Sequence, residues 1–388
     1  MLSTMKAFGK KSMKVLCEIH ALSFSHSSSS AKVTPYIHRL PVEILEQVFL
    51  LIVQSAPGCS NIFLCGRDTI SVDVASPPLV LTRVCRRWRV VAHSTPGVWS
   101  RIQVILPGQV KSFKPSIPHL LQCWLARSGS LPLALHIVTK PRSRRKHPCT
   151  LTSAANYRLL YILLAERKRW ETVVMPDGYD WNLDFDTPQL RTLACHWSNF
   201  SEFNAPNLVR LSISSHCFPV TPTCKDLRHL YLQTVSARTI SSTIAIFPHL
   251  ETIVVDIISY GDDPASRSVS ATLESMTLPL PPFMSDTDFR NEFIDMFSQL
   301  HLPVLRKLTL AGLPQKGQVK CLLAALGVAP FQVPVVDFQT DAPLSKAQMN
   351  NIAPLFSIVG EVTLYGELAQ INEYRHSRME KLKLCFSR

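Results

Sequence analysis

The chain has 388 residues, of which 46% are hydrophobic, and it carries a formal net charge of +13 with a pI near 9.3. Its longest uncharged apolar stretches, 48–53 and 321–331, are much shorter than the roughly 20 residues that cross a bilayer, which excludes a transmembrane helix. The eleven cysteines are scattered without a C-x-x-C pair, which indicates reduced thiols in an intracellular protein rather than a disulfide framework.

Residues 1–34 are predicted to form a disordered leader. They are basic through Lys6, Lys10, Lys11 and Lys14, and they end in four serines at 27–30. The same composition is compatible with a transit peptide, although the segment lacks arginine and a continuous apolar run. The residues alone leave both interpretations open.

Two short helices with broad apolar stripes are predicted next. Pro41 suits the first turn of a helix, and the apolar residues after it recur at helical spacing. The stripes comprise Ile44, Leu45, Val48, Phe49 and Ile52 in the first helix and Leu81, Val84, Trp88 and Val91 in the second, which Arg83, Arg86, Arg87 and Arg89 flank. A turn at 95–97 should return Trp99 onto both helices. Because so small a unit buries little surface, part of these stripes is expected to serve a partner.

Together, residues 40–53 and 79–102 resemble the F-box, particularly the form found in large families of fungal F-box proteins. The Leu-Pro start, the Ile-Leu and Val-Phe pairs, the Val-Cys-x-x-Trp sequence and the Trp99 turn occur in the expected order. The insert at about 55–78 is longer than the usual link. The resemblance implies docking on the small acidic Skp adaptor of an SCF-type cullin-RING ubiquitin ligase, through Leu40, Pro41, Ile44, Leu45, Val48, Phe49, Val84, Cys85 and Trp88.

Residues 105–166 are predicted to form a connecting region of helix, strand and helix. The first helix runs from Leu120 toward Gly129, which suits a helix end. The alternation of apolar residues over Leu131–Val138 predicts a strand, and a second helix is predicted over Tyr157–Glu166.

From Trp170 onward, apolar residues recur at positions i, i+3 and i+5. The copies are Trp170/Val173/Met175, Leu190/Leu193/Cys195, Leu208/Leu211/Ile213, Leu227/Leu230/Leu232, Leu250/Ile253/Val255, Leu273/Met276/Leu278 and Leu305/Leu308/Leu310. Their starts are about 18 to 32 residues apart, so the region 167–388 resembles a degenerate leucine-rich-repeat array. The expected fold is therefore α/β, with an N-terminal three-helix F-box-like unit at 35–104 followed by an irregular leucine-rich-repeat solenoid.

Such an array would present an outward strand face for recognition. Candidate residues on it are Arg191, His196, Arg210, Arg228, His229, Tyr231 and Asp256. Nothing in the sequence assigns a substrate contact among them.

The densest basic run is 140–147, KPRSRRKH. It fits a solvated loop, a nuclear-import signal or a phosphate-binding patch. An alternative function follows from it: a basic leucine-rich-repeat scaffold that binds RNA or DNA through Arg142, Arg144, Arg145 and Lys146 and the arginines of the strand face.

Catalytic motifs are absent from the sequence, which has no G-x-S-x-G elbow, no Walker-type loop, only 13 glycines and no paired Cys and His spacing for a metal. We expect a protein that is not an enzyme and needs no cofactor or metal. The leading hypothesis is a substrate-receptor subunit that binds a Skp-type adaptor, and through it a cullin, while holding a protein substrate of unknown identity. Its expected location is cytoplasmic, nuclear or both, with no membrane partner.

Overall fold

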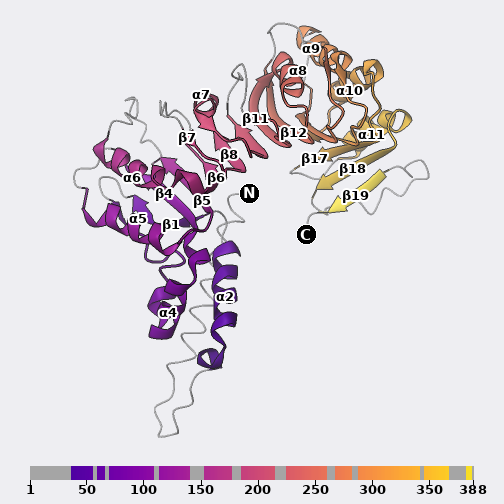
Figure 1. Cartoon of the computed structure of the whole chain (residues 1–388). Helices are drawn as coiled ribbons and strands as arrows, with labels where there is room; N and C mark the ends of the chain where they lie inside the picture. The colour runs from indigo at the N-terminus through magenta and orange to yellow at the C-terminus, as the bar shows by residue number, and fades with distance from the viewer. Residues whose placement is uncertain are drawn as a thin grey trace. The chain divides into compact units, whose positions relative to one another are not determined.

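The computed structural model describes residues 36–55, 59–65, 70–108, 113–139, 153–176, 185–214, 224–259, 267–281, 287–340, 345–366 and 382–386. The chain divides into two compact units, Met1–Pro176 (unit 1) and Asp177–Arg388 (unit 2). Each unit contains parallel strands with helices beside them (Figure 1). None of the helices in the described part of the chain has the length and apolar character needed to cross a membrane.

Unit 1 begins with a group of helices that we call the helical part. It consists of η1 (Tyr36–Arg39), α2 (Val42–Ser55), α3 (Leu81–Val84), α4 (Arg86–Ser94) and η2 (Pro96–Trp99). The break between α3 and α4 is a single extended residue, Cys85, whose thiol accepts a hydrogen bond from the backbone N–H of Trp88. α4 packs on both α2 and η2.

The strands of unit 1 form a parallel sheet in the order β1-β4-β5-β6. They are β1 (Ser60–Asn61), β4 (Arg101–Leu106), β5 (Leu133–Thr139) and β6 (Trp170–Val174), accompanied by α5 (Ser116–Arg127), α6 (Ala154–Leu164) and η3 (Arg167–Arg169). The residues between α2 and α3 also form the antiparallel hairpin of β2 (Phe63–Cys65) and β3 (Ile70–Val72). Strict alternation of buried and half-buried residues along β4 explains why this segment is a strand with one face in the core.

Unit 2 continues the same pattern, with parallel strands adjacent in chain order. They are β8 (Thr192–Cys195), β10 (Arg210–Ile213), β11 (His229–Ser236), β12 (Thr252–Ser259), β14 (Ser275–Pro279), β16 (Lys307–Ala311), β17 (Val335–Gln339), β18 (Glu361–Gly366) and β19 (Leu382–Phe386). Short strands pair beside them, β7 (Phe185–Asp186) with β9 (Phe203–Asn204) and β13 (Ser268–Val269) with β15 (Leu300–His301).

The helices of unit 2 are α7 (Trp197–Phe200), α8 (Ala237–Ile246), α9 (Thr287–Gln299), α10 (Lys316–Val328), α11 (Lys346–Ile352) and η4 (Ala353–Ser357). From α8 to α11, each packs against the next, and Figure 1 shows them in a row beside the strands. The core lies between this row and one face of the sheet. In-register residues of adjacent strands fill it, including Leu211, Leu230, Ile253, Met276 and Leu308.

The expected fold, an N-terminal three-helix F-box-like unit followed by a leucine-rich-repeat solenoid, is wrong. The structure is an α/β fold in which parallel strands flanked by helices already begin in the N-terminal part, since β1 lies inside the expected insert at 55–78. The i, i+3, i+5 pattern reports only that one face of a strand is buried. A parallel strand with only one face covered by helices produces the same alternation in either architecture, so the pattern could not distinguish the two.

Candidate partner-docking surface

α2 has two apolar faces, and only one of them is needed for folding. The helix begins beside Pro41, whose carbonyl oxygen accepts a hydrogen bond from the N–H of Leu45 at 3.2 Å. At 100° per residue, Leu45, Phe49 and Val53 fall on one face, and all three are buried. The neighbouring face carries a second apolar stripe, which includes Ile44 and Leu51.

The buried face of α2 packs on α4 and η2 through aromatic side chains. The ring centroids of Phe49 and Trp88 are 4.9 Å apart. The indole N–H of Trp99 donates to the carbonyl oxygen of Ala92 at 2.6 Å, and the indole N–H of Trp124 donates to that of Trp99 at 3.1 Å. These bonds satisfy two buried donors and fix η2 against both α4 and α5.

The exposed apolar stripe of α2 consists of Ile44, Val48 and Leu51, spaced i, i+4 and i+7. Ile44 is 48% exposed and Leu51 is 63% exposed, while Val48 is half-buried. Val90 on α4 is similarly exposed, at 61%. Because α2 exposes large aliphatic side chains at helical spacing although its other face is already packed, we take Ile44, Val48 and Leu51 as the candidate docking surface, and Val90 is a separate exposed position on α4.

Exposed arginines lie on α3 and α4, the helices that follow α2 in this part of unit 1. Arg83, Arg86 and Arg89 are exposed on α3 and α4, and Arg89 donates through Nε to the carbonyl oxygen of Thr82 at 2.8 Å. Arg87 donates to the carbonyl oxygen of Leu40, which connects α4 to a residue two positions before α2. Burial and the nearby guanidinium groups of Arg127 and Arg89 lower the pKa of His93, as expected in a positively charged environment. The exposed arginines of α3 and α4 would favour an acidic partner.

The structure separates the nine predicted docking residues into three groups. Leu45, Phe49 and Trp88 are buried and support the fold; Pro41, Ile44 and Val84 are exposed; Leu40, Val48 and Cys85 are half-buried. The prediction did not include Leu51, which is exposed on the stripe of α2, or Val90, which is exposed on α4. Leu51 was detectable because it lies seven residues after Ile44, two turns along the same helix face.

The predicted recognition residues of unit 2 lie on or beside neighbouring strands. On β10 and β11, Arg210 and His229 are in register, and the ring nitrogen Nδ1 of His229 is 2.9 Å from Oγ1 of Thr252 on β12. Burial lowers the pKa of His229, and the charges of Arg210 and Arg228 add to this effect.

Three more of these predicted residues form ion pairs or hydrogen bonds with side chains on neighbouring strands or loops. Arg228 forms an ion pair with Glu251 at 2.8 Å. The hydroxyl of Tyr231 donates to the carboxylate of Asp256. Burial, followed by this hydrogen bond and the charge of Asp256, raises the pKa of Tyr231 to about 12. The arrangement is a hydrogen-bonded polar face without a defined ligand geometry.

The remaining two strand-face candidates lie on or just before β8 and α7. Arg191 is exposed, and its carbonyl oxygen accepts from the backbone N–H of Arg210 at 2.9 Å. The Nδ1 atom of His196 is 2.9 Å from the hydroxyl of Ser198 and caps the start of α7. His196 therefore has a local structural role.

The basic run 140–147 and the leader 1–34 lie outside the described residues. In the part of the chain that the structure describes, no group of three or more His, Cys, Asp or Glu side chains is placed to hold a metal ion. Neither a scan of the chain against protein-family models nor a search of curated proteins gave a match.

Proposed function

We propose that this protein is a non-catalytic substrate-receptor subunit of an SCF-type cullin-RING ubiquitin ligase. In this proposal the helical part of unit 1 docks on a Skp-type adaptor, and unit 2 holds a protein substrate near the ligase. The supporting observation is the stripe of Ile44, Val48 and Leu51, which stays exposed although α2 already buries a full apolar face. The sequence resemblance of residues 40–53 and 79–102 to the F-box supplies the identity of the partner.

The two parts of the surface would contribute differently to binding. The aliphatic stripe would provide affinity through burial, at roughly 25 cal/mol per Å² of apolar surface before the costs of association. The arginines of α3 and α4 would steer the acidic adaptor and fix its register, which raises the association rate more than the affinity. Binding should therefore persist at moderate salt.

The proposal is tested by co-expressing the full chain with a Skp-type adaptor and measuring complex formation by size exclusion at moderate salt. The variant Ile44→Asp/Leu51→Asp changes only exposed positions and should abolish the complex without unfolding the helical part. The matched control is Ile358→Asp, an apolar-to-acid change at a position of unit 2 that is 49% exposed. Loss of the complex in the α2 variant alone supports the proposal.

Two results would reject it. One is that the folded wild-type chain does not associate with the adaptor. The other is that the α2 variant co-elutes with the adaptor as fully as the wild type does. In the second case, the exposed stripe is not the docking surface, and the sequence resemblance does not extend to function.

A further inference from the structure

The positive charge of this protein is concentrated in one segment. Between Asp73 and Glu166 the sequence contains no Asp or Glu and fourteen Lys and Arg, which exceeds the net charge of +13 of the entire chain. In the structure this segment supplies α3, α4, α5, α6, β4 and β5 of unit 1. Seven of the fourteen lie in these elements, four of them in α3 and α4, and six lie outside the described residues. The net positive charge of the segment favours phosphate-rich partners.

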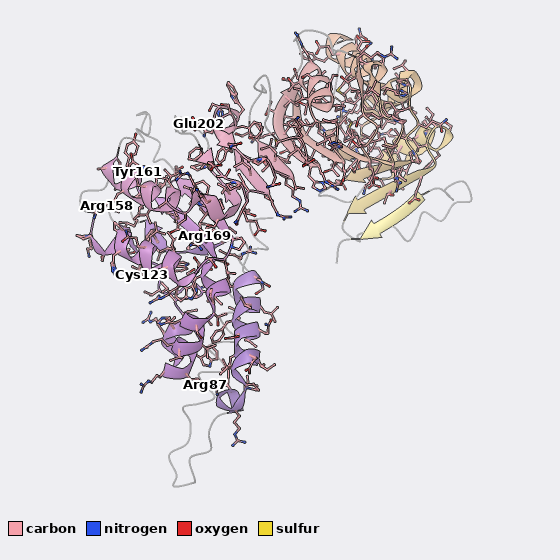
Figure 2. All side chains as sticks on the ribbon, viewed as in Figure 1. Arg87, Cys123, Arg158, Tyr161, Arg169 and Glu202 are labelled. Atoms are coloured by element: carbon pink, nitrogen blue, oxygen red, sulfur yellow. The ribbon has the colours of Figure 1, made fainter. Side chains whose placement is uncertain are left out.

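α6 carries one cationic residue, Arg158, together with two exposed aromatic rings. Tyr157 and Tyr161 are 47% and 67% exposed, and no other Phe, Tyr or Trp whose exposure the structure describes is as open to solvent. They are one turn apart, so their Cβ atoms are about 6 Å from each other. Arg158, which follows Tyr157 in the sequence, is also exposed (Figure 2 labels Arg158 and Tyr161), whereas Leu159 and Leu163 are buried.

The helix does not need these tyrosines for packing. α6 is held against α5 and β4 by its other side. Its N-terminus is capped by Ser153, whose hydroxyl accepts from the N–H of Asn156 at 3.2 Å, and the side chain of Asn156 in turn accepts from the N–H of Gly108 at 2.9 Å. The tyrosine face is thus a rigid platform directed away from the core. Lys168, which follows α6 in η3, is also exposed.

We propose that the exposed face of α6 binds single-stranded nucleic acid, with bases stacking on Tyr157 and Tyr161 and phosphates contacting Arg158 and Lys168. Stacking on aromatic rings combined with positive charge is the general chemistry of single-strand binding. A duplex does not satisfy it, because its bases already stack on each other. A protein partner would use the same tyrosines differently, burying them among apolar groups.

Binding of single strands by α6 does not depend on adaptor docking, which is proposed for α2. It also differs from binding through Arg142 to Lys146 or the strand face of unit 2. The basic run 140–147 precedes α6 in the sequence and adds positive charge to the same segment, but the proposal needs none of its residues.

The test measures fluorescence anisotropy of labelled U and dT oligonucleotides of about 12 nucleotides, within the usual size range of such sites, bound to the full chain at 50 and 200 mM salt. Tyr157→Leu/Tyr161→Leu removes the rings and keeps apolar bulk, and Tyr157→Phe/Tyr161→Phe keeps the rings. Arg158→Gln is paired with Arg86→Gln, which removes the same charge from α4. Far-UV circular dichroism verifies folding of each variant.

We expect the leucine pair to weaken binding about tenfold or more and the phenylalanine pair to bind within about twofold of wild type. Arg158→Gln should weaken binding more than Arg86→Gln and reduce the salt dependence. A duplex of equal length should bind more weakly than either single strand. Comparison of U with dT oligonucleotides then shows whether the site prefers an RNA or a DNA strand. The adaptor-docking variant Ile44→Asp/Leu51→Asp should bind as the wild type does, which keeps the two proposals separable.

Three results would overturn the inference. The first is wild-type protein that binds neither oligonucleotide at 50 mM salt. The second is a leucine pair that binds like wild type, which would show that the tyrosines do not stack with bases. The third combines two observations: Arg158→Gln and Arg86→Gln weaken binding equally, and polyglutamate displaces the oligonucleotide. Together they would show only that unit 1 attracts polyanions in general.

Discussion

The aromatic rings of Phe49 on α2 and Trp88 on α4 lie with their centroids 4.9 Å apart and their planes inclined at 58°. Both side chains are buried, and the contact joins two helices separated by a long stretch of sequence. Tilted aromatic pairs of this kind add about 0.5–1.5 kcal/mol to the stabilisation from burial alone. The pair therefore anchors the helical part of unit 1.

Phe49→Ala should lower the free energy of unfolding of the helical part by about 3–5 kcal/mol, because it deletes a fully buried ring and leaves a cavity. Amide hydrogen exchange measured by mass spectrometry should show faster exchange across α2 and α4. Ile44→Ala is the control on the same helix, and its exposed position predicts a change within about 0.5 kcal/mol. Equal effects of the two substitutions would contradict the assignment of inner and outer faces.

Arg169 closes the end of α5. Its guanidinium group donates to the carbonyl oxygens of Leu125, Gly129 and Leu131 and to the hydroxyl of Ser128 (Figure 2 labels Arg169). These carbonyl groups lie in the last turn of the helix or just beyond it, and that of Leu125 also accepts from the N–H and the hydroxyl of Ser128. A positive charge at this end interacts favourably with the helix dipole.

Arg169→Ala should destabilise unit 1 by about 2–4 kcal/mol, and Arg169→Lys should recover less than half of that loss, because a single ammonium group cannot reach several acceptors in a planar fork. Urea denaturation checks both values. Lys168→Ala, at the exposed neighbouring position, serves as the control and should change little. A lysine variant as stable as wild type would show that charge alone, without the fork geometry, supports this helix end.

Two glycines of unit 2 should respond to alanine with opposite signs. In α10, a Cβ at Gly327 would meet no atom within 4 Å, so Gly327→Ala should raise stability by about 0.5–1 kcal/mol through helix propensity. At Gly360 a Cβ would lie 2.9 Å from the carbonyl oxygen of Pro334, a backbone atom that cannot move aside, so Gly360→Ala should lower stability by about 1 kcal/mol or more. Thermal unfolding of the two variants provides the measurement, and shifts of the same sign would contradict the prediction.

The hydroxyl of Tyr231 should lose its proton at a higher pH than that of an ordinary tyrosine. Because burial, the hydrogen bond to Asp256 and the charge of that carboxylate raise its pKa to about 12, the folded state holds this proton more tightly than the unfolded state does. Its contribution to stability is therefore fully present below pH 10 and is lost as the pH rises toward 12. Difference absorbance of tyrosinate between wild type and Tyr231→Phe gives the titration directly.

Asp256→Asn should move the pKa of Tyr231 back toward 10, since it removes the negative charge next to the phenol. The shift should be partial, because burial is the larger cause. An unchanged titration in Asp256→Asn would mean that the two side chains are not in contact in solution.

The buried strand positions could be predicted from the sequence, but the architecture could not. Leu211, Leu230 and Ile253 each follow local alternation, and alternation depends only on which side of a strand is covered. Where the sheet starts depends on β1, which has only two residues, Ser60 and Asn61, and neither its length nor its composition gives a periodic signal. Its pairing with β4 is a long-range contact that no local pattern records.

The sequence predicted apolar stripes on α2 and α4 but not which of their side chains are exposed. Ile44 and Leu45 are adjacent in one apolar stripe, and the position of Trp88 on α4 decides which of them faces inward. The sequence specifies both stripes without specifying how they pack. Only the packing shows that Leu45 is structural and that Leu51, which the prediction omitted, is exposed.

β1 also has a protective consequence for unit 1. It lies at the end of the strand order and pairs with β4, where Ser60 is opposite Ile102 and the N–H of Ile62 donates to the carbonyl oxygen of Gln103 at 3.2 Å. Uncovered, β4 would offer a row of free peptide groups to any extended chain, which is how sheets of separate molecules join and aggregate. The stretch that separates the two helical segments thus covers the part of this edge at Ile102 and Gln103, and it reduces the length of β4 open to such association between copies of the protein.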